Sequence, residues 1–202
     1  MSTNQAKFWA GEFGNEYIER NNSKEFLAAN IHFFSEIFSH LPTQPKSFIE
    51  FGANIGVNGQ ALKLLFPNSH YTGVEINAKA IEILKETADQ VSHTSIEKYE
   101  VSGQHSVSFT KGVLIHLNPD SLNSAYEKLY SSSERWILIA EYYNPTPVAI
   151  DYRGYSDRLF KRDFAGELIS KYPDLHLLGS GFSYHLNPFP QDDITWFLLE
   201  KN

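Results

Sequence analysis

Apolar residues recur along the chain with two periods, and the two periods follow one another in a regular cycle. Residues 23–41 carry apolar side chains three and four positions apart and stop before Pro42, which predicts a helix. Short apolar runs then alternate with stretches of helical spacing, and such alternation predicts parallel strands joined by helical crossovers. We expect strands at 47–51, 70–75, 91–96, within 106–117 and at 136–142, and helices at 23–41, 56–66, 77–90, 121–130 and 160–172.

The end of the chain has a different pattern. Residues 175–185 and 194–201 are two strand-like runs, and the loop between them contains proline and aspartate but no helical spacing. Two such runs predict an antiparallel hairpin at one end of the sheet. The predicted fold class is therefore α/β and Rossmann-like, with seven strands, one of them antiparallel, and helices on both faces.

Length and composition narrow the possibilities further. The 202 residues suit a single domain, 1–202, in which 1–45 form an N-terminal helical lid and packing helix and 46–202 form the Rossmann-like core. The net charge of −7 argues against nucleic acid as a partner, and no apolar run is long enough to cross a membrane. The start of the chain lacks the pattern of a secretory signal, so we expect a cytoplasmic protein. Its oligomeric state stays open.

The numbers of cysteine and histidine residues limit the kinds of catalytic and metal sites that the chain can form. The chain has no cysteine, which excludes disulfides, thiolate nucleophiles and cysteine-ligated zinc. Its eight histidines do not form a compact ligand set with the acidic residues, so no metal site is predicted.

The most informative segment is a glycine-rich turn between a predicted strand and a predicted helix. It reads Glu50-Phe-Gly52-Ala53-Asn54-Ile-Gly56. Glycine lets a backbone turn sharply and approach a ligand, and the helix that follows offers unpaired amide donors. Glu75 ends the next strand 75 − 52 = 23 positions after Gly52, close to the offset at which a carboxylate accepts hydrogen bonds from a ribose. These residues predict a nucleoside-containing cofactor; the alternative is a plain tight turn with Glu75 at a solvated strand end.

Three cofactors compete for such a turn. ATP binding of the P-loop type requires Gly-Lys-Ser/Thr, which is absent. Glu50 would repel the pyrophosphate of NAD but suits the ammonium group of a methionine moiety. Charge therefore favours S-adenosylmethionine. On this hypothesis, removing Glu75 weakens cofactor binding and leaves folding nearly intact.

Several further blocks resemble one family, the pseudaminic acid biosynthesis-associated methylases, which are class I S-adenosylmethionine-dependent methyltransferases. Besides the glycine-rich turn, the blocks are Phe8-Trp9-Ala-Gly11-Glu-Phe13-Gly14-Asn-Glu-Tyr17-Ile-Glu-Arg20-Asn21, Lys111-Gly-Val-Leu-Ile-His116-Leu-Asn-Pro119, Glu141-Tyr142-Tyr143-Asn-Pro-Thr-Pro147, Tyr152-Arg153-Gly154, Phe160-Lys-Arg-Asp163-Phe and Asp193-Ile-Thr-Trp196-Phe-Leu-Leu-Glu-Lys. The resemblance implies a class I methyltransferase fold, S-adenosylmethionine as cofactor with S-adenosylhomocysteine as product, and a nonulosonic sugar or its precursor as acceptor of the methyl group.

The sequence departs from common methyltransferase patterns at the cofactor turn and near the adenine. Asn54 replaces a frequent glycine, but asparagine tolerates left-handed dihedrals, so the turn survives. Ser95 stands where an aspartate often holds the adenine amine. The expected cofactor contacts comprise Glu50, Gly52, Ala53, Asn54, Gly56, Glu75, Ile76, Ser95, Ile96, Lys111, Trp9 and Phe13.

The reaction centre is expected beyond the carboxyl ends of the fourth and fifth strands. His116 is the candidate general base, because its ordinary pKa lies near neutral pH; the alternative is a buried histidine bonded to backbone. Glu141 is a second catalytic candidate, or else a structural ion-pair partner. The candidate substrate-binding residues are Tyr142, Tyr143, Tyr152 and Arg153, the last either pairing with an anionic acceptor or lying at the surface. Trp9 and Phe13 either close a lid over the cofactor or pack an amphipathic helix on the core.

The sequence thus predicts a methyltransferase that acts on an oxygen or nitrogen of a small-molecule acceptor. Three alternatives remain open: a methyltransferase for an amino acid, peptide or other carboxylated metabolite, a non-catalytic binding protein with the same fold, and an NAD oxidoreductase.

Overall fold

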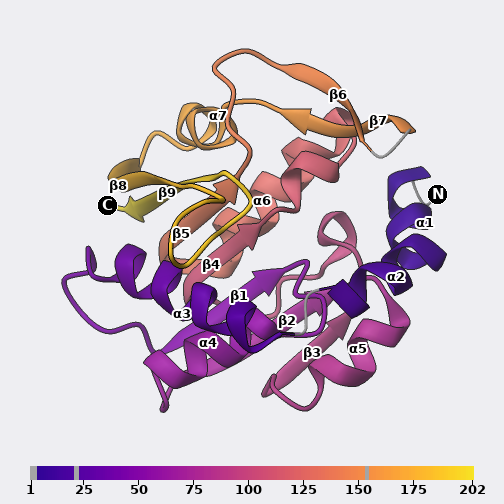
Figure 1. Ribbon diagram of the computed structural model, residues 1–202. Coiled ribbons are helices and arrows are strands. Elements are labelled where there is room, and N and C mark those ends of the chain that lie inside the picture. The colour runs from indigo at the N-terminus through magenta and orange to yellow at the C-terminus, as the bar shows by residue number, and fades with distance from the viewer. Residues whose placement is uncertain (1–3, 21–22, 153–154) are drawn as a thin grey trace.

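A computed structural model describes residues 4–20, 23–152 and 155–202, and its centre is a seven-stranded sheet (Figure 1). The strand order is β3-β2-β1-β4-β5-β9-β8. The strands are β1 (Ser47–Phe51), β2 (His70–Glu75), β3 (Gln90–His93), β4 (His105–Lys111), β5 (Ser133–Glu141), β8 (Leu175–Ser183) and β9 (Ile194–Lys201). Only β9 runs antiparallel to its neighbours β5 and β8, so the predicted sheet is confirmed.

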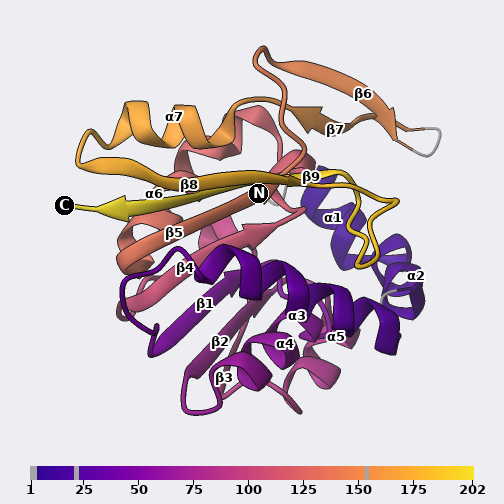
Figure 2. The same cartoon turned by 60° about the vertical axis from the view of Figure 1, so that its left-hand side comes forward.

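Helices cover both faces of this sheet, as expected (Figure 2). One face packs on α3 (Lys24–Phe38), α4 (Val57–Leu65) and α5 (Ala78–Leu84), and the other on α6 (Leu122–Ser132) and α7 (Phe164–Lys171). The alternation of side chains along a strand explains the two layers. In β1, Phe48 faces the α3 layer, whereas Ile49 and Phe51 face the α6 layer.

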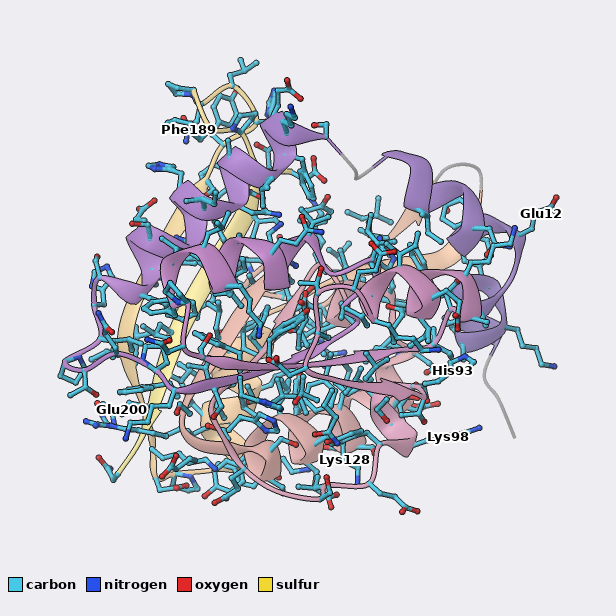
Figure 3. All side chains as sticks on the ribbon, turned by 90° about the horizontal axis from the view of Figure 1, so that it is seen from below. Glu12, His93, Lys98, Lys128, Phe189 and Glu200 are labelled. Carbon is cyan, nitrogen blue, oxygen red and sulfur yellow. The ribbon has the colours of Figure 1, made fainter. Side chains whose placement is uncertain are left out.

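Short helices complete the edge of the sheet where the parallel strands end. The N-terminal helices α1 (Asn4–Ala10) and α2 (Glu12–Arg20) lie beside that edge, and three single turns follow β3 and β4. These turns are η1 (Ile96–Lys98), η2 (Leu114–His116) and η3 (Pro119–Ser121). Figure 3 shows Glu12 and Lys98 pointing outward and Phe189 at the loop between β8 and β9.

The structure corrects the sequence prediction in three places. The strand predicted at 91–96 is shorter and lies at Gln90–His93 (β3). The helix predicted at 77–90 is also shorter and spans Ala78–Leu84 (α5). The start of the predicted helix 160–172 belongs to a strand, because a separate hairpin of β6 (Val148–Tyr152) and β7 (Tyr155–Lys161) precedes α7. This hairpin projects beyond the main sheet (Figure 2).

Among the described residues, no helix is long and apolar enough to cross a membrane.

Candidate functional site

A cavity of about 180 Å³ opens at the carboxyl ends of β1, β2 and β4. Such ends are where open α/β sheets bind ligands. The cavity wall combines the glycine-rich turn, the ends of β2 and β4, the segment after β3 and the helix α1. The expected cofactor residues among its lining are Gly52, Ala53, Asn54, Glu75, Ile76, Ser95, Ile96, Lys111 and Trp9, and the expected base His116 also lines it.

The glycine-rich turn has the left-handed backbone that its sequence suggests. Gly52 and Gly56 have φ angles of 78° and 83°, and Asn54 has 47°, so Asn54 adopts the left-handed conformation expected of it. A Cβ atom on Gly52 would lie 2.4 Å from Cγ2 of Val113, which leaves no room for a side chain. The turn therefore depends on glycine both for its dihedral angles and for its contact with the segment after β4.

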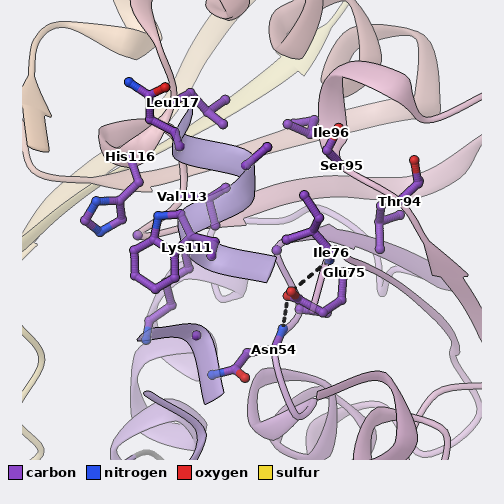
Figure 4. A pocket seen from close by; sticks show the side chains of 18 of the residues that line it. Asn54, Glu75, Ile76, Thr94, Ser95, Ile96, Lys111, Val113, His116 and Leu117 are labelled. Atoms are coloured by element: carbon purple, nitrogen blue, oxygen red, sulfur yellow. Dashed lines mark hydrogen bonds between the residues drawn. The ribbon is translucent and has the colours of Figure 1, made fainter. Parts of the chain in front are cut away.

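Glu75 connects this turn to the end of β2. Its carboxylate accepts hydrogen bonds from the backbone amides of Asn54 at 2.8 Å, Ile76 at 2.8 Å and Asn77 at 2.7 Å (Figure 4). Burial raises the pKa of Glu75, and these amide bonds oppose that rise. Oε1 already accepts from both Ile76 and Asn77, whereas Oε2 accepts only from Asn54, so Oε2 can accept one further bond from a ligand hydroxyl.

This arrangement revises the expectation that removing Glu75 leaves folding nearly intact. The three amides would lose their acceptor in a largely buried place, and unpaired buried amides are costly. Glu75 thus supports the turn as well as facing the cavity.

Glu50 lies behind the cavity wall instead of forming part of it. Its side chain is buried and accepts hydrogen bonds from Nδ2 of Asn58, at 2.6 Å, and from the hydroxyl of Tyr71. Asn58, which does line the cavity, separates Glu50 from it. Burial raises the pKa of Glu50 to about 7. Gly56, the N-cap residue that precedes α4, is also absent from the lining, although the next residue, Val57, belongs to it.

The segment after β3 forms the opposite end of the cavity from Lys111. Thr94, Ser95, Ile96 and Glu97 line it there, with Glu75 and Asn54 between the two ends (Figure 4). Oε2 of Glu97 is buried and has no hydrogen-bond partner in the described part of the chain. Glu97 is not among the residues predicted from the sequence, although an acidic residue two positions after Ser95 is a signal that could identify it.

The N-terminal helices cover one side of the cavity. The Trp9 ring lies 4.7 Å from the His116 ring, centroid to centroid, and Phe13 stacks on Phe8 at 4.2 Å. Phe13 does not line the cavity itself but supports Trp9, whose ring it meets edge to face. Asn77 fastens these helices to the core, because its Nδ2 donates to the Trp9 carbonyl at 3.2 Å and to Oδ1 of Asn15 at 3.1 Å.

Glu141, the second catalytic candidate, lies beneath the turn η2 and does not line the cavity. Its carboxylate accepts hydrogen bonds from the backbone amides of Val113 at 3.0 Å, Leu114 at 3.1 Å and Ile115 at 3.4 Å. The side chain is buried, and burial raises its pKa to about 7. Glu141 thereby holds the turn that carries His116, which is a positioning role.

The two candidate substrate residues whose side chains the structure describes, Tyr142 and Tyr143, lie away from the cavity. Tyr142 is half-buried with Nζ of Lys161 5.2 Å from its ring centroid, and Tyr143 is exposed with its ring 5.7 Å from that of Phe197. Neither residue lines the cavity. The side chain of Tyr152 and the whole of Arg153 lie outside the described residues.

Comparison with known proteins identifies the fold. No protein-family model matches the sequence, and no curated protein matches it. Among solved structures, the chain is similar to the plantazolicin methyltransferase in complex with S-adenosylhomocysteine, with a TM-score of 0.68, 14% identity, and coverage of 98% of this chain and 94% of that one. It is similar to the magnesium protoporphyrin IX methyltransferase of Synechocystis PCC 6803 with bound S-adenosylmethionine, with a TM-score of 0.69, 9% identity, and coverage of 99% and 98%.

A third similar structure is the 1,6-didemethyltoxoflavin-N1-methyltransferase of Burkholderia thailandensis, with a TM-score of 0.69, 12% identity, and coverage of 94% of this chain and 85% of that one. Together with the strand order, these similarities show that the fold is that of the class I methyltransferases.

Proposed function

We propose that this protein is an S-adenosylmethionine-dependent methyltransferase. The observation that carries the proposal is Glu75, which lies in the wall of the cavity between the glycine-rich turn and Glu97. A carboxylate in this place, with Oε2 free to accept one more bond, suits a hydroxyl group of a ribose. The similar structures that contain S-adenosylmethionine or S-adenosylhomocysteine support the same cofactor.

The residues at the two ends of the cavity fit the rest of such a molecule. Glu97 has a buried oxygen with no partner among the described residues, and this oxygen would accept a hydrogen bond from the adenine amine. Ile96, buried beside it, provides an apolar contact for the ring. At the other end, the Lys111 ammonium lines the cavity and the carboxyl group of Glu50 lies behind Asn58, and this pair suits a zwitterionic amino acid better than a pyrophosphate.

The reaction that follows from this cofactor is transfer of a methyl group. S-adenosylmethionine supplies an electrophilic methyl group on a sulfonium, which an acceptor oxygen or nitrogen attacks in line. The contribution of the protein is then to hold the acceptor close and aligned, and Trp9 and η2 shape the wall where it would approach. His116 takes the proton of a hydroxyl or ammonium acceptor, and Glu141 holds the turn that places it.

The acceptor that we favour is a nonulosonic sugar or its precursor. Support for it comes from the resemblance of the blocks around Trp9, Lys111, Glu141 and Asp193 to the pseudaminic acid biosynthesis-associated methylases. The similar solved structures are named for a range of other acceptors, so a carboxylated metabolite or a peptide is the competing class.

Two experiments, first on ligand binding and then on product release, test the proposal. S-adenosylhomocysteine should raise the melting temperature, because a ligand that binds only the native state stabilises it, and NADH should not. Release of S-adenosylhomocysteine is then measured over a panel of nonulosonic sugars, sugar nucleotides, amino acids and peptides. Binding of NADH without binding of either adenosyl compound would contradict the proposed cofactor, whereas binding without release on any acceptor would indicate a non-catalytic protein.

A further inference from the structure

The Lys161 side chain ends β7 in a half-buried place without a negative partner. Its Nζ lies 5.2 Å from the ring centroid of Tyr142, and the face of an aromatic ring attracts a cation. In the described part of the chain, this ammonium makes no hydrogen bond and no ion pair. A polar group that is partly withdrawn from water normally has a hydrogen-bond partner, so an anion from outside would complete this environment.

The acidic side chain whose charge acts on Lys161 is held by another residue. Oδ1 of Asp193 accepts a hydrogen bond from the backbone amide of His185 at 2.9 Å, and Nδ1 of His185 lies 2.8 Å from the same oxygen. These two hydrogen bonds lower the pKa of Asp193, and the charge of Lys161 adds to the effect. The backbone of Asp193 has a φ angle of 53°, which is uncommon for a residue with a side chain. Asp193 therefore stays with His185 and leaves Lys161 without a close counter-ion.

These residues lie at the end of the sheet that also carries the cavity. Tyr142 follows β5, and Asp193 precedes β9, the antiparallel neighbour of β5. β7 packs on η2, the turn whose His116 lines the cavity. In Figure 2, the hairpin of β6 and β7 and the loop between β8 and β9 extend past the sheet on the same side, toward α1. Because neighbouring strands are about 5 Å apart, the ends of β4 and β5 are close enough for one sugar to span both.

We propose that Lys161 binds the carboxylate of a sugar-acid acceptor whose reacting atom lies at the cavity. The inference rests on the proposed function and names the part of the acceptor that the protein recognises. Nε2 of His185 has no hydrogen-bond partner among the described residues and can bond a hydroxyl group of the same molecule. A cation and an imidazole on either side of Asp193 match a ligand that carries a carboxylate and hydroxyl groups together.

The experiment combines a change in the protein with a change in the ligand. Titrations followed by NMR signals of the ligand compare wild type, Lys161→Met and Lys161→Arg, each saturated with S-adenosylhomocysteine. The probes are N-acetylneuraminic acid and its methyl ester, in which the carboxyl group has no charge. Wild type should bind the ester about 10-fold more weakly than the acid, as for the loss of a charged hydrogen bond. Lys161→Met should bind both probes as weakly as wild type binds the ester, and Lys161→Arg should keep the preference for the acid.

A matched control is Lys171→Met. Nζ of Lys171 also lies over a tyrosine ring, 5.7 Å from the centroid of Tyr172, but at the opposite end of α7 from Lys161. This variant should bind both probes as wild type does.

The comparison of the two probes on wild type decides the matter even if Lys161→Met fails to fold. Equal affinity for the acid and the ester overturns the inference, and so does the absence of binding of both. Calorimetry with S-adenosylhomocysteine on the same samples separates this inference from the proposed function. If S-adenosylhomocysteine binds and the sugar acid does not, only the inference is wrong; if S-adenosylhomocysteine does not bind, the proposed function is wrong and the inference falls with it.

Discussion

At the scale of single residues, the two carboxylates nearest to the turns of the site hold backbone amides. Glu75 accepts from three amides around the glycine-rich turn, and Glu141 from three amides of the turn that carries His116. A side chain that stabilises a loop and also faces a ligand gives mixed effects when it is replaced. Substitutions here are therefore informative only when binding and stability are measured together.

For Glu75, we expect both effects at once. Glu75→Ala should weaken S-adenosylhomocysteine binding by roughly 1.5 to 3 kcal/mol through the loss of one charge-assisted hydrogen bond to the ribose, and it should lower the midpoint of urea unfolding because three amides lose their acceptor. Glu75→Gln keeps one carbonyl oxygen and should recover part of the stability. An unchanged dissociation constant in Glu75→Ala, with reduced stability, would mean that Glu75 supports the turn and nothing more.

For His116, the proposed role of general base predicts a loss in the chemical step. His116→Ala should lower kcat by about 100-fold or more, with partial recovery at higher pH where the acceptor loses its own proton. The affinity for S-adenosylhomocysteine is the necessary control, because His116 also contacts Trp9 over the cavity. If kcat per folded molecule is preserved, transfer proceeds by alignment alone and His116 is a packing residue of the lid.

At the scale of elements, the sequence predicts the central sheet well and its periphery poorly. Buried strands such as β5 are continuous apolar runs, and the final hairpin of β8 and β9 lacks helical spacing, so both can be read from the pattern. In β6, Val148, Ile150 and Asp151 are all exposed, so no alternation of buried and exposed positions marks it as a strand. The short β3 is likewise half exposed, which explains why its bounds were misplaced.

Only some residues of the candidate site can be predicted from the sequence. Gly52, Asn54 and Glu75 follow from local rules, since their chemistry depends on neighbours in the chain. The placements of Glu50, Glu97 and Glu141 depend on which side chains other elements bring to them. The carboxylate of Glu50 accepts hydrogen bonds from Tyr71 and Asn58, and that of Glu141 accepts from backbone amides at η2. Neither arrangement has a signal in the sequence.

At the scale of the whole molecule, buried carboxyl groups make stability depend on pH in an uncommon direction. Burial raises the pKa of Glu50 and of Glu141 to about 7, above the ordinary value of 4.5. The native state then keeps protons that the unfolded state has lost between about pH 4.5 and 7, so the free energy of unfolding falls as pH rises through this window. Each group can contribute up to about 3 kcal/mol by this linkage.

Urea unfolding at pH 5.5 and pH 8 measures this dependence. Burial lowers the pKa of His105, which works in the opposite direction, so the comparison must be made between wild type and variants. Glu50→Gln together with Glu141→Gln should flatten the decline in stability between the two pH values, and Glu82→Gln at an exposed position should not. A decline of equal size in the double variant would show that these two carboxyl groups are ionised in the native protein at both pH values.

One residue described above, Asn77, ties the cover of the cavity to its floor. Its backbone amide donates to Glu75, while its Nδ2 donates to the carbonyl oxygen of Trp9 and to Oδ1 of Asn15. If the ribose binds Glu75 as proposed, the segment beside it is the same one that anchors the N-terminal helices over the cavity. We then expect the exchange of spent cofactor for fresh cofactor to require movement of these helices and to limit turnover once an acceptor is saturating.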